Sequence, residues 1–172
     1  MRIVCLGDSN TKGLDPRSFI YEEYEYPWPR LLEKRLNQTV INEGEHGQCV
    51  YSMKEEYEYL DSILRADDMI VLMLGTNDLL KDRNLSLIEQ RLDQLVNYLQ
   101  AYSCLLICPV DVKGKSLVEV YQSVSKKYQI PFLNANMWNI QISYDEVHFT
   151  QEGHESIAKE LAQYLKTVFM NL

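Results

Sequence analysis

Apolar residues follow two alternating patterns along the chain. Continuous apolar runs predict strands buried on both faces of a sheet, and they fall at residues 3–6, 69–74 and 104–108. Shorter runs predict two more strands, at 39–42 and 130–133. Between the runs, apolar residues recur every three or four positions, which predicts helices at 28–36, 52–64, 85–99, 117–124 and 157–168.

Strands that alternate with helices favour parallel pairing through right-handed crossovers. We therefore predict an α/β fold: a three-layer α/β/α sandwich with a five-stranded parallel sheet of flavodoxin-like topology. The chain has 172 residues and shows no linker or internal repeat, so a single domain spanning 1–172 is expected.

Composition narrows the range of partners. The formal net charge is −8, and no basic stripe is present to bind nucleic acid or an anionic membrane surface. The sequence contains no run of 18 apolar residues, so we expect no transmembrane helix. The apolar stretch at 3–6 is too short for the core of a signal peptide. We expect a cytoplasmic protein whose four cysteines (Cys5, Cys49, Cys104 and Cys108) are reduced.

Ligands of open parallel sheets bind beyond the carboxyl ends of the strands, which draws attention to the loop "GDSNTKG" at residues 7–13. The loop lacks the Lys-Ser/Thr ending of a nucleotide-binding P-loop. Its small polar residues leave a second hypothesis, a loop that binds the phosphate of a flavin. However, Pro16 follows closely and no helix is predicted before Trp28, which disfavours that reading.

The same loop also suits a nucleophilic serine, which requires a base, a group that orients the base, and oxyanion donors. His148 lies three residues after Asp145, a spacing at which the carboxylate can reach Nδ1 and leave Nε2 for the Ser9 proton. We expect His154 to serve surface or helix packing. His46 lies beside the second loop, near the expected site, and has only Glu43 or Glu45 as a neighbouring orienting group.

Two further loops offer oxyanion donors. Asn77 lies in "GTND", directly after the most apolar run, and would present a side-chain amide. The segment "NEGEHGQ" at 42–48 contains two glycines, either of which allows a backbone N–H to point inward. We expect Asp8, beside the serine, to hydrogen-bond the loop backbone.

Together, the blocks "GDSNTKG", "NEGEHGQ", "GTND" and "DEVHFTQEGH" resemble those of the SGNH, or GDSL-like, hydrolases across nearly the whole chain. The stretches "GDSNTKGLDP" and "YPWPRLLEKRL" are similar to the arylesterase and acyltransferase-like branch of that family. The resemblance implies that Ser9 is the nucleophile, His148 the base and Asp145 the acid that orients the base. It also implies three oxyanion donors: the backbone amide of Ser9, the backbone amide of Gly47 (rather than that of Gly44) and the side chain of Asn77.

The resemblance implies a serine esterase for small-molecule acyl esters, such as O-acetylated sugars, that needs no metal or cofactor. A lysophospholipase or thioesterase for longer chains is one alternative, and a flavin-binding or catalytically inactive ligand-binding module is another. Lys12 stands where the branch often has an aromatic residue, and we expect it to contact the leaving group. The segment "YEEYEY" at 21–26 is a substrate flap, a solvated face or a contact in a homo-oligomer.

Overall fold

A single parallel sheet organises the chain, as the computed structural model shows for residues 2–18, 20 and 22–168. Its strands lie in the order β2-β1-β3-β4-β5. Their bounds are Ile3–Gly7 (β1), Val40–Gly44 (β2), Met69–Met73 (β3), Ser103–Cys108 (β4) and Phe132–Asn134 (β5). This arrangement confirms the predicted α/β fold with five parallel strands and flavodoxin-like strand order.

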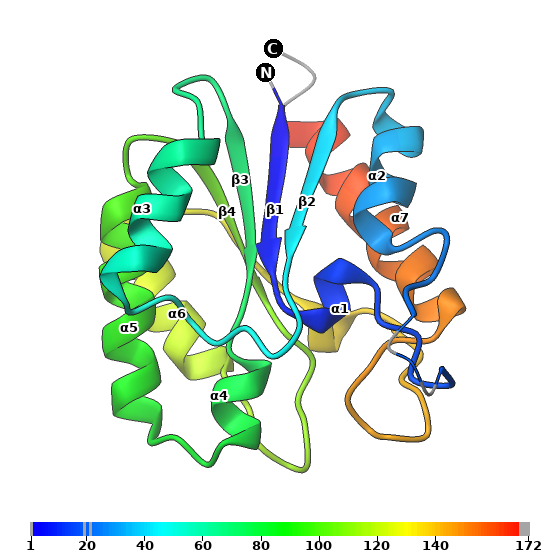
Figure 1. Cartoon of the computed structure of the whole chain (residues 1–172). Coiled ribbons are helices and arrows are strands. Elements are labelled where there is room, and N and C mark those ends of the chain that lie inside the picture. The colour runs from blue at the N-terminus through cyan, green and yellow to red at the C-terminus, as the bar shows by residue number, and fades with distance from the viewer. Residues whose placement is uncertain (1, 19, 21, 169–172) are drawn as a thin grey trace.

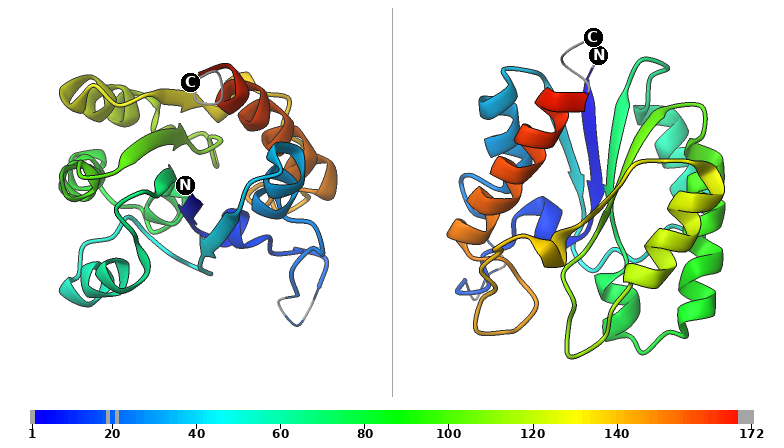
Figure 2. Two further views of the ribbon diagram at one scale, coloured as in Figure 1. Left: turned by 90° about the horizontal axis from the view of Figure 1, so that it is seen from above. Right: turned by 180° about the vertical axis from the view of Figure 1, so that it is seen from behind.

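Helices cover both faces of the sheet, which gives three layers (Figures 1 and 2). One face carries α2 (Trp28–Leu36) and α7 (Gln151–Val168), which pack against each other. The opposite face carries α3 (Lys54–Ile63), α5 (Leu85–Leu99) and α6 (Val118–Tyr128). The predicted apolar spacings at 28–36 and 85–99 coincide with α2 and α5.

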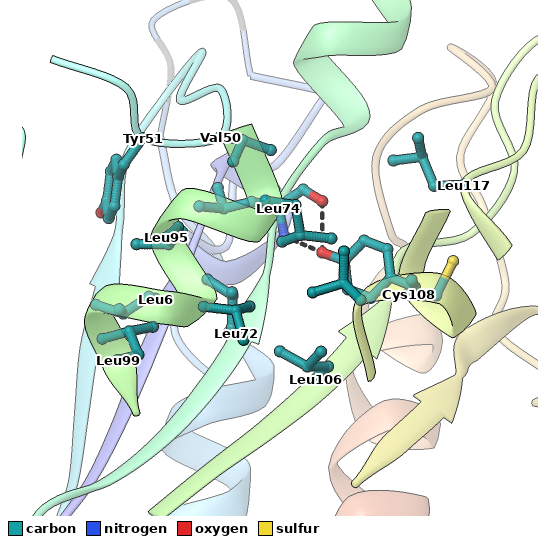
Figure 3. Packing of buried hydrophobic residues seen from close by; sticks show 14 of the residues in the cluster. Leu6, Val50, Tyr51, Leu72, Leu74, Leu95, Leu99, Leu106, Cys108 and Leu117 are labelled. Atoms are coloured by element: carbon teal, nitrogen blue, oxygen red, sulfur yellow. Dashed lines mark hydrogen bonds between the residues drawn. The ribbon is translucent and has the colours of Figure 1, made fainter. Parts of the chain in front are cut away.

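The sheet separates two apolar cores because successive residues of a strand point to opposite faces. Within β1, Val4 and Leu6 join the core beneath α3, α5 and α6, whereas Ile3 and Cys5 join the core beneath α2 and α7. Figure 3 shows the first core, where a tyrosine hydroxyl binds the backbone of Leu74. This hydroxyl belongs to Tyr121, which donates to the Leu74 carbonyl at 2.7 Å and accepts its N–H at 3.1 Å. That pair of bonds fixes the carboxyl end of β3.

Three short helical segments were not predicted from the sequence. They are α1 (Ser9–Lys12), α4 (Thr76–Leu80) and the 3₁₀ turn η1 (Ala135–Met137). The expectation that no helix begins before Trp28 is therefore wrong. Segments of three to five residues are too short to show a periodicity of 3.6. The edge strands also begin later than expected, at Val40 and Phe132.

The described cysteines carry no disulfide, and Cys5, Cys104 and Cys108 are buried in strands, as expected for small apolar residues. Trp28 is completely buried against the sheet. In the part of the chain that the structure describes, no helix has the length and apolar character needed to cross a membrane. Tyr21, the first residue of the 21–26 segment, lies outside the described residues.

His154 serves packing, one of the two roles expected for it. Its ring is fully buried, with Nδ1 accepting the Trp28 N–H at 3.3 Å. The rings of Tyr24 and Phe149 meet it edge-on, at centroid distances of 5.3 and 5.5 Å. Burial lowers the pKa of His154 from 6.5 to about 3, so this imidazole stays neutral in the folded protein.

We expect this histidine to make the protein sensitive to acid. Between pH 6.5 and about 3 the unfolded chain binds a proton at His154 that the folded chain does not bind. The free energy of unfolding therefore falls by up to about 1.4 kcal/mol per pH unit through this residue as the pH drops. The free energy of unfolding, measured by urea titration at several pH values from 6 to 4, is expected to fall less steeply with decreasing pH in His154→Asn than in wild type. His46→Asn is the control, and an unchanged slope in His154→Asn would contradict the prediction.

Candidate active site

The Ser9 turn (residues 7–12) leads from β1 into α1 at the carboxyl edge of the sheet. Ser9 is the first residue of α1, and Asp8 caps the helix by accepting the Asn10 N–H at 2.9 Å. This bond confirms the backbone role expected for Asp8. Burial raises the pKa of the Asp8 carboxyl from 3.8 to about 6, against the opposing effect of its hydrogen bonds.

Two glycines bring α1 directly onto the strands. A Cβ on Gly7 would lie 2.0 Å from Oγ1 of Thr11, and a Cβ on Gly44 would lie 2.2 Å from the Lys12 nitrogen. Only glycine fits at such close approaches. The Ser9 turn therefore packs directly on the backbone of β1 and β2, where Ser9 is only 7% exposed.

The structure brings Ser9, His148 and Asp145 together. Ser9 Oγ lies 2.9 Å from His148 Nε2, across 139 positions of sequence. His148 Nδ1 lies 2.5 Å from Asp145 Oδ2, and Asp145 Oδ1 accepts the N–H groups of Val147 and His148 at 3.1 and 3.0 Å. Partial burial acts to raise the pKa of Asp145, but the hydrogen bonds from His148 and the backbone outweigh it and lower that pKa.

At the carboxyl edge of the sheet, three groups have an N–H hydrogen with no acceptor among the described hydrogen bonds. Neither the Ser9 N–H nor the Gly47 N–H has an acceptor among the described hydrogen bonds, whereas the Gly44 N–H donates to Asn42 Oδ1 at 3.0 Å. Gly47 is in the left-handed region, with φ of +71°. Asn77 Nδ2 gives one hydrogen to the Gln48 carbonyl at 3.0 Å and retains the other. This arrangement is suited to holding an oxyanion.

The role of Asp78 was not predicted from the sequence. This side chain is fully buried, and its Oδ2 accepts the Val50 N–H at 2.8 Å. Its Oδ1 lies 2.6 Å from Arg83 and 3.7 Å from Arg91, so the buried carboxylate is paired. Asn77 and Asp78 thus fix the 45–50 loop from two adjacent positions of α4. An acidic residue after a strand carries no local sign of such long-range contacts.

Charged side chains line the rim near α1. Lys12 Nζ lies 3.0 Å from both carboxylate oxygens of Glu45 and 4.0 Å from Glu23. The hydrogen bond from Lys12 lowers the pKa of Glu45. His46 Nε2 lies 3.6 Å from Glu23 Oε1, so this cluster joins α1, the 45–50 loop and the 14–24 segment. Among the described residues, no group of three or more His, Cys, Asp or Glu side chains is placed to hold a metal ion.

The fold and the strand-end blocks match known proteins. A family model for the GDSL-like Lipase/Acylhydrolase family covers residues 5–156. The aryl esterase of M. smegmatis is 23% identical, with a TM-score of 0.78 over 98% of this chain and 99% of that one. Est24, a carbohydrate acetylesterase from Sinorhizobium meliloti, is 20% identical, with a TM-score of 0.84 over 98% and 99%.

A more distant likeness is to the lipase/acylhydrolase from Enterococcus faecalis, 20% identical, with a TM-score of 0.72 over 96% of this chain and 95% of that one. No curated protein sequence is close enough to count as a relative. The family match spans most of the chain and includes all four blocks at the sheet edge. The chain belongs to the GDSL-like lipase/acylhydrolase family and is a carboxylic ester hydrolase.

Proposed function

We propose that the protein is a serine esterase that hydrolyses small acyl esters, acetyl esters among them, through Ser9, His148 and Asp145. The observation that carries the proposal is the continuous chain of contacts from Ser9 Oγ through the His148 ring to Asp145, at 2.9 and 2.5 Å. Serine is a weak nucleophile on its own, and a base held in this way is the usual means of activating it.

In the proposed first half-reaction, Ser9 Oγ attacks the ester carbonyl carbon while its proton passes to His148 Nε2. Asp145 holds Nδ1–H and stabilises the imidazolium that forms. The carbonyl oxygen becomes negative and is held by the backbone N–H groups of Ser9 and Gly47 and by the second amide hydrogen of Asn77.

Collapse of the tetrahedral intermediate breaks the bond to the leaving alcohol, which takes the proton from His148. The second half-reaction repeats these steps with water. His148 removes a proton from water, the resulting hydroxide adds to the acyl-Ser9 ester, and Ser9 departs with the proton returned by His148. No step consumes a further reactant.

The charged rim supports a small or polar substrate. The pair formed by Lys12 and Glu45 lies beside α1, with Glu23 close to it. A long alkyl chain crossing this rim would have to desolvate those charges, which is unfavourable. The similar structure described as a carbohydrate acetylesterase is consistent with a short acyl group.

Hydrolysis of p-nitrophenyl acetate and p-nitrophenyl octanoate by the wild-type protein tests this proposal. We expect a higher kcat/KM for the acetate, and O-acetylated sugars are then the next substrates to assay. A preference for octanoate would favour the lysophospholipase or thioesterase alternative. Failure to hydrolyse either ester would count against an active esterase and favour a ligand-binding role.

Lys12→Ala tests the contact that we propose between Lys12 and the leaving group. The pair with Glu45 is partly exposed and contributes little to folding, so the variant is expected to stay folded. We expect kcat on p-nitrophenyl acetate to stay within about twofold and the preference between sugar and aryl acetates to change by about 5–20-fold, the range of one lost substrate contact. Lys54→Ala removes another paired surface lysine and is the control. Unchanged selectivity in Lys12→Ala would end the proposal.

A further inference from the structure

The side chain of Asn10 connects the Ser9 turn to the loop that carries His148. Its Nδ2 donates to the Val147 carbonyl at 3.0 Å, and its Oδ1 accepts the Phe149 N–H at 3.0 Å. One carboxamide therefore holds the backbone immediately before and immediately after His148. Asn10 is 5% exposed, so water competes little for either bond.

Most other hydrogen bonds of the base loop (residues 143–149) lie within the loop. Two further attachments leave it: Tyr144 Oη donates to the Pro16 carbonyl at 2.6 Å, and the Phe149 side chain is buried in the core beneath α2 and α7. Ser143 N–H donates to the His148 carbonyl at 2.8 Å, and the remaining bonds near the ring come from Asp145. Among the described hydrogen bonds, apart from the Ser9–His148 contact, only those of Asn10 link this loop to α1. Asn10 therefore sets where the loop stands relative to the adjacent Ser9.

Asn10 is itself held firmly. It is the second residue of α1, and its N–H is bound by the buried carboxyl of Asp8. Ser9 and Asn10 are adjacent residues of one short helix. The residue that holds the loop of the proposed base is therefore only one peptide bond away from the proposed nucleophile. Catalytic groups must be held within about 0.5 Å of their productive geometry, and a displacement of 1 Å can cost about 10²-fold in rate.

We propose that Asn10 is a positioning residue that fixes the His148 imidazole against Ser9 by bracketing its backbone on both sides. This inference rests on the proposed roles of Ser9 and His148. Without the bracket, the Val147 carbonyl and Phe149 N–H lose their partner, and the loop shifts to satisfy them elsewhere. The imidazole then moves away from Oγ, although every catalytic group is still present.

The test compares Asn10→Leu, which keeps the branched shape and the number of heavy atoms but has no polar side-chain atoms, with a matched control. Asn136 makes a similar bracket far along the chain: its Oδ1 accepts the Asp111 N–H at 2.8 Å, and its Nδ2 lies 3.4 Å from the Pro109 carbonyl. For Asn10→Leu we expect kcat to fall by about 10–100-fold with KM within about threefold. Asn136→Leu is expected to lower the melting temperature without this loss of kcat.

A second readout separates positioning from a general loss of stability. The proton between His148 Nδ1 and Asp145 gives a downfield ¹H NMR signal, which we expect Asn10→Leu to shift or broaden and Asn136→Leu to leave in place. Asn10→Ala gives the same comparison should Asn10→Leu fail to fold. A folded Asn10 variant with wild-type kcat and an unchanged signal would overturn the inference.

His148→Ala, measured in parallel, distinguishes the two levels of the argument. Loss of activity in His148→Ala with full activity in Asn10→Leu would overturn the bracket alone. Full activity in His148→Ala would overturn the proposed function on which the bracket rests.

Discussion

Ser9→Ala is expected to lower kcat for p-nitrophenyl acetate by about 10⁴–10⁶-fold, the loss that follows removal of a nucleophile from a serine triad. The change removes one oxygen atom at a site that is 7% exposed, and the cap from Asp8 to α1 does not involve that oxygen. The fold and substrate binding are therefore expected to persist. The residual rate reports the stabilisation supplied by the oxyanion donors and binding alone.

Steady-state hydrolysis, with folding checked by circular dichroism, measures this effect. Ser62→Ala is a suitable control because it also removes a helical hydroxyl, one that donates to the Tyr59 carbonyl on α3. Ser62→Ala is expected to have wild-type activity. Retention of more than about one-tenth of wild-type kcat by folded Ser9→Ala would rule out Ser9 as the nucleophile, since chemistry that needs it cannot proceed at that rate.

Asn77→Ala is expected to lower kcat by about 10²–10³-fold, with a much smaller change in KM, because an oxyanion donor binds the charge that develops in the transition state. The change also frees the Gln48 carbonyl, which Asn77 holds at 3.0 Å in the loop that contains Gly47. Loss of that anchor loosens a second donor, which places the expected effect toward the upper end of the range.

The matched control for Asn77 is Asn97→Ala, on the exposed face of α5, where the amide contacts only Gln100 among the described side chains. Wild-type kinetics are expected for that variant. A rise in KM at unchanged kcat in Asn77→Ala would mean that Asn77 contributes to ground-state binding and not to the oxyanion.

The repeating pattern of apolar residues accounts for most of the fold. The run at 69–74 corresponds to β3 and the spacing at 85–99 to α5, because burial on one or two faces leaves a regular trace in the sequence. The turns that matter for chemistry leave no such trace. α1 and α4 are four and five residues long and are held by a cap and by contacts with neighbouring loops.

The residues of the candidate site that lie in loops directly after strands could be predicted from the sequence. Parallel strands deliver Ser9, Gly47 and Asn77 to one edge, and the three-residue spacing brings Asp145 to His148. The bond between Asn10 and Phe149 spans 139 positions, and the bond between Asp78 and Val50 spans 28. Such side-chain to backbone contacts depend on the tertiary arrangement, so a single sequence contains no pattern that reveals them.

The distance in sequence between Ser9 and His148, the proposed nucleophile and base, has a consequence for biosynthesis. A growing chain emerges from the ribosome N-terminal end first, so Ser9 is exposed long before His148 is translated. The nascent polypeptide can pair β1 with β2 and β3, but in the proposed mechanism it has no base for Ser9 until the segment after β5 has been made. In the proposed mechanism, ester cleavage begins only after His148 has been synthesised, and prematurely terminated chains that lack the segment after β5 are expected to be inert.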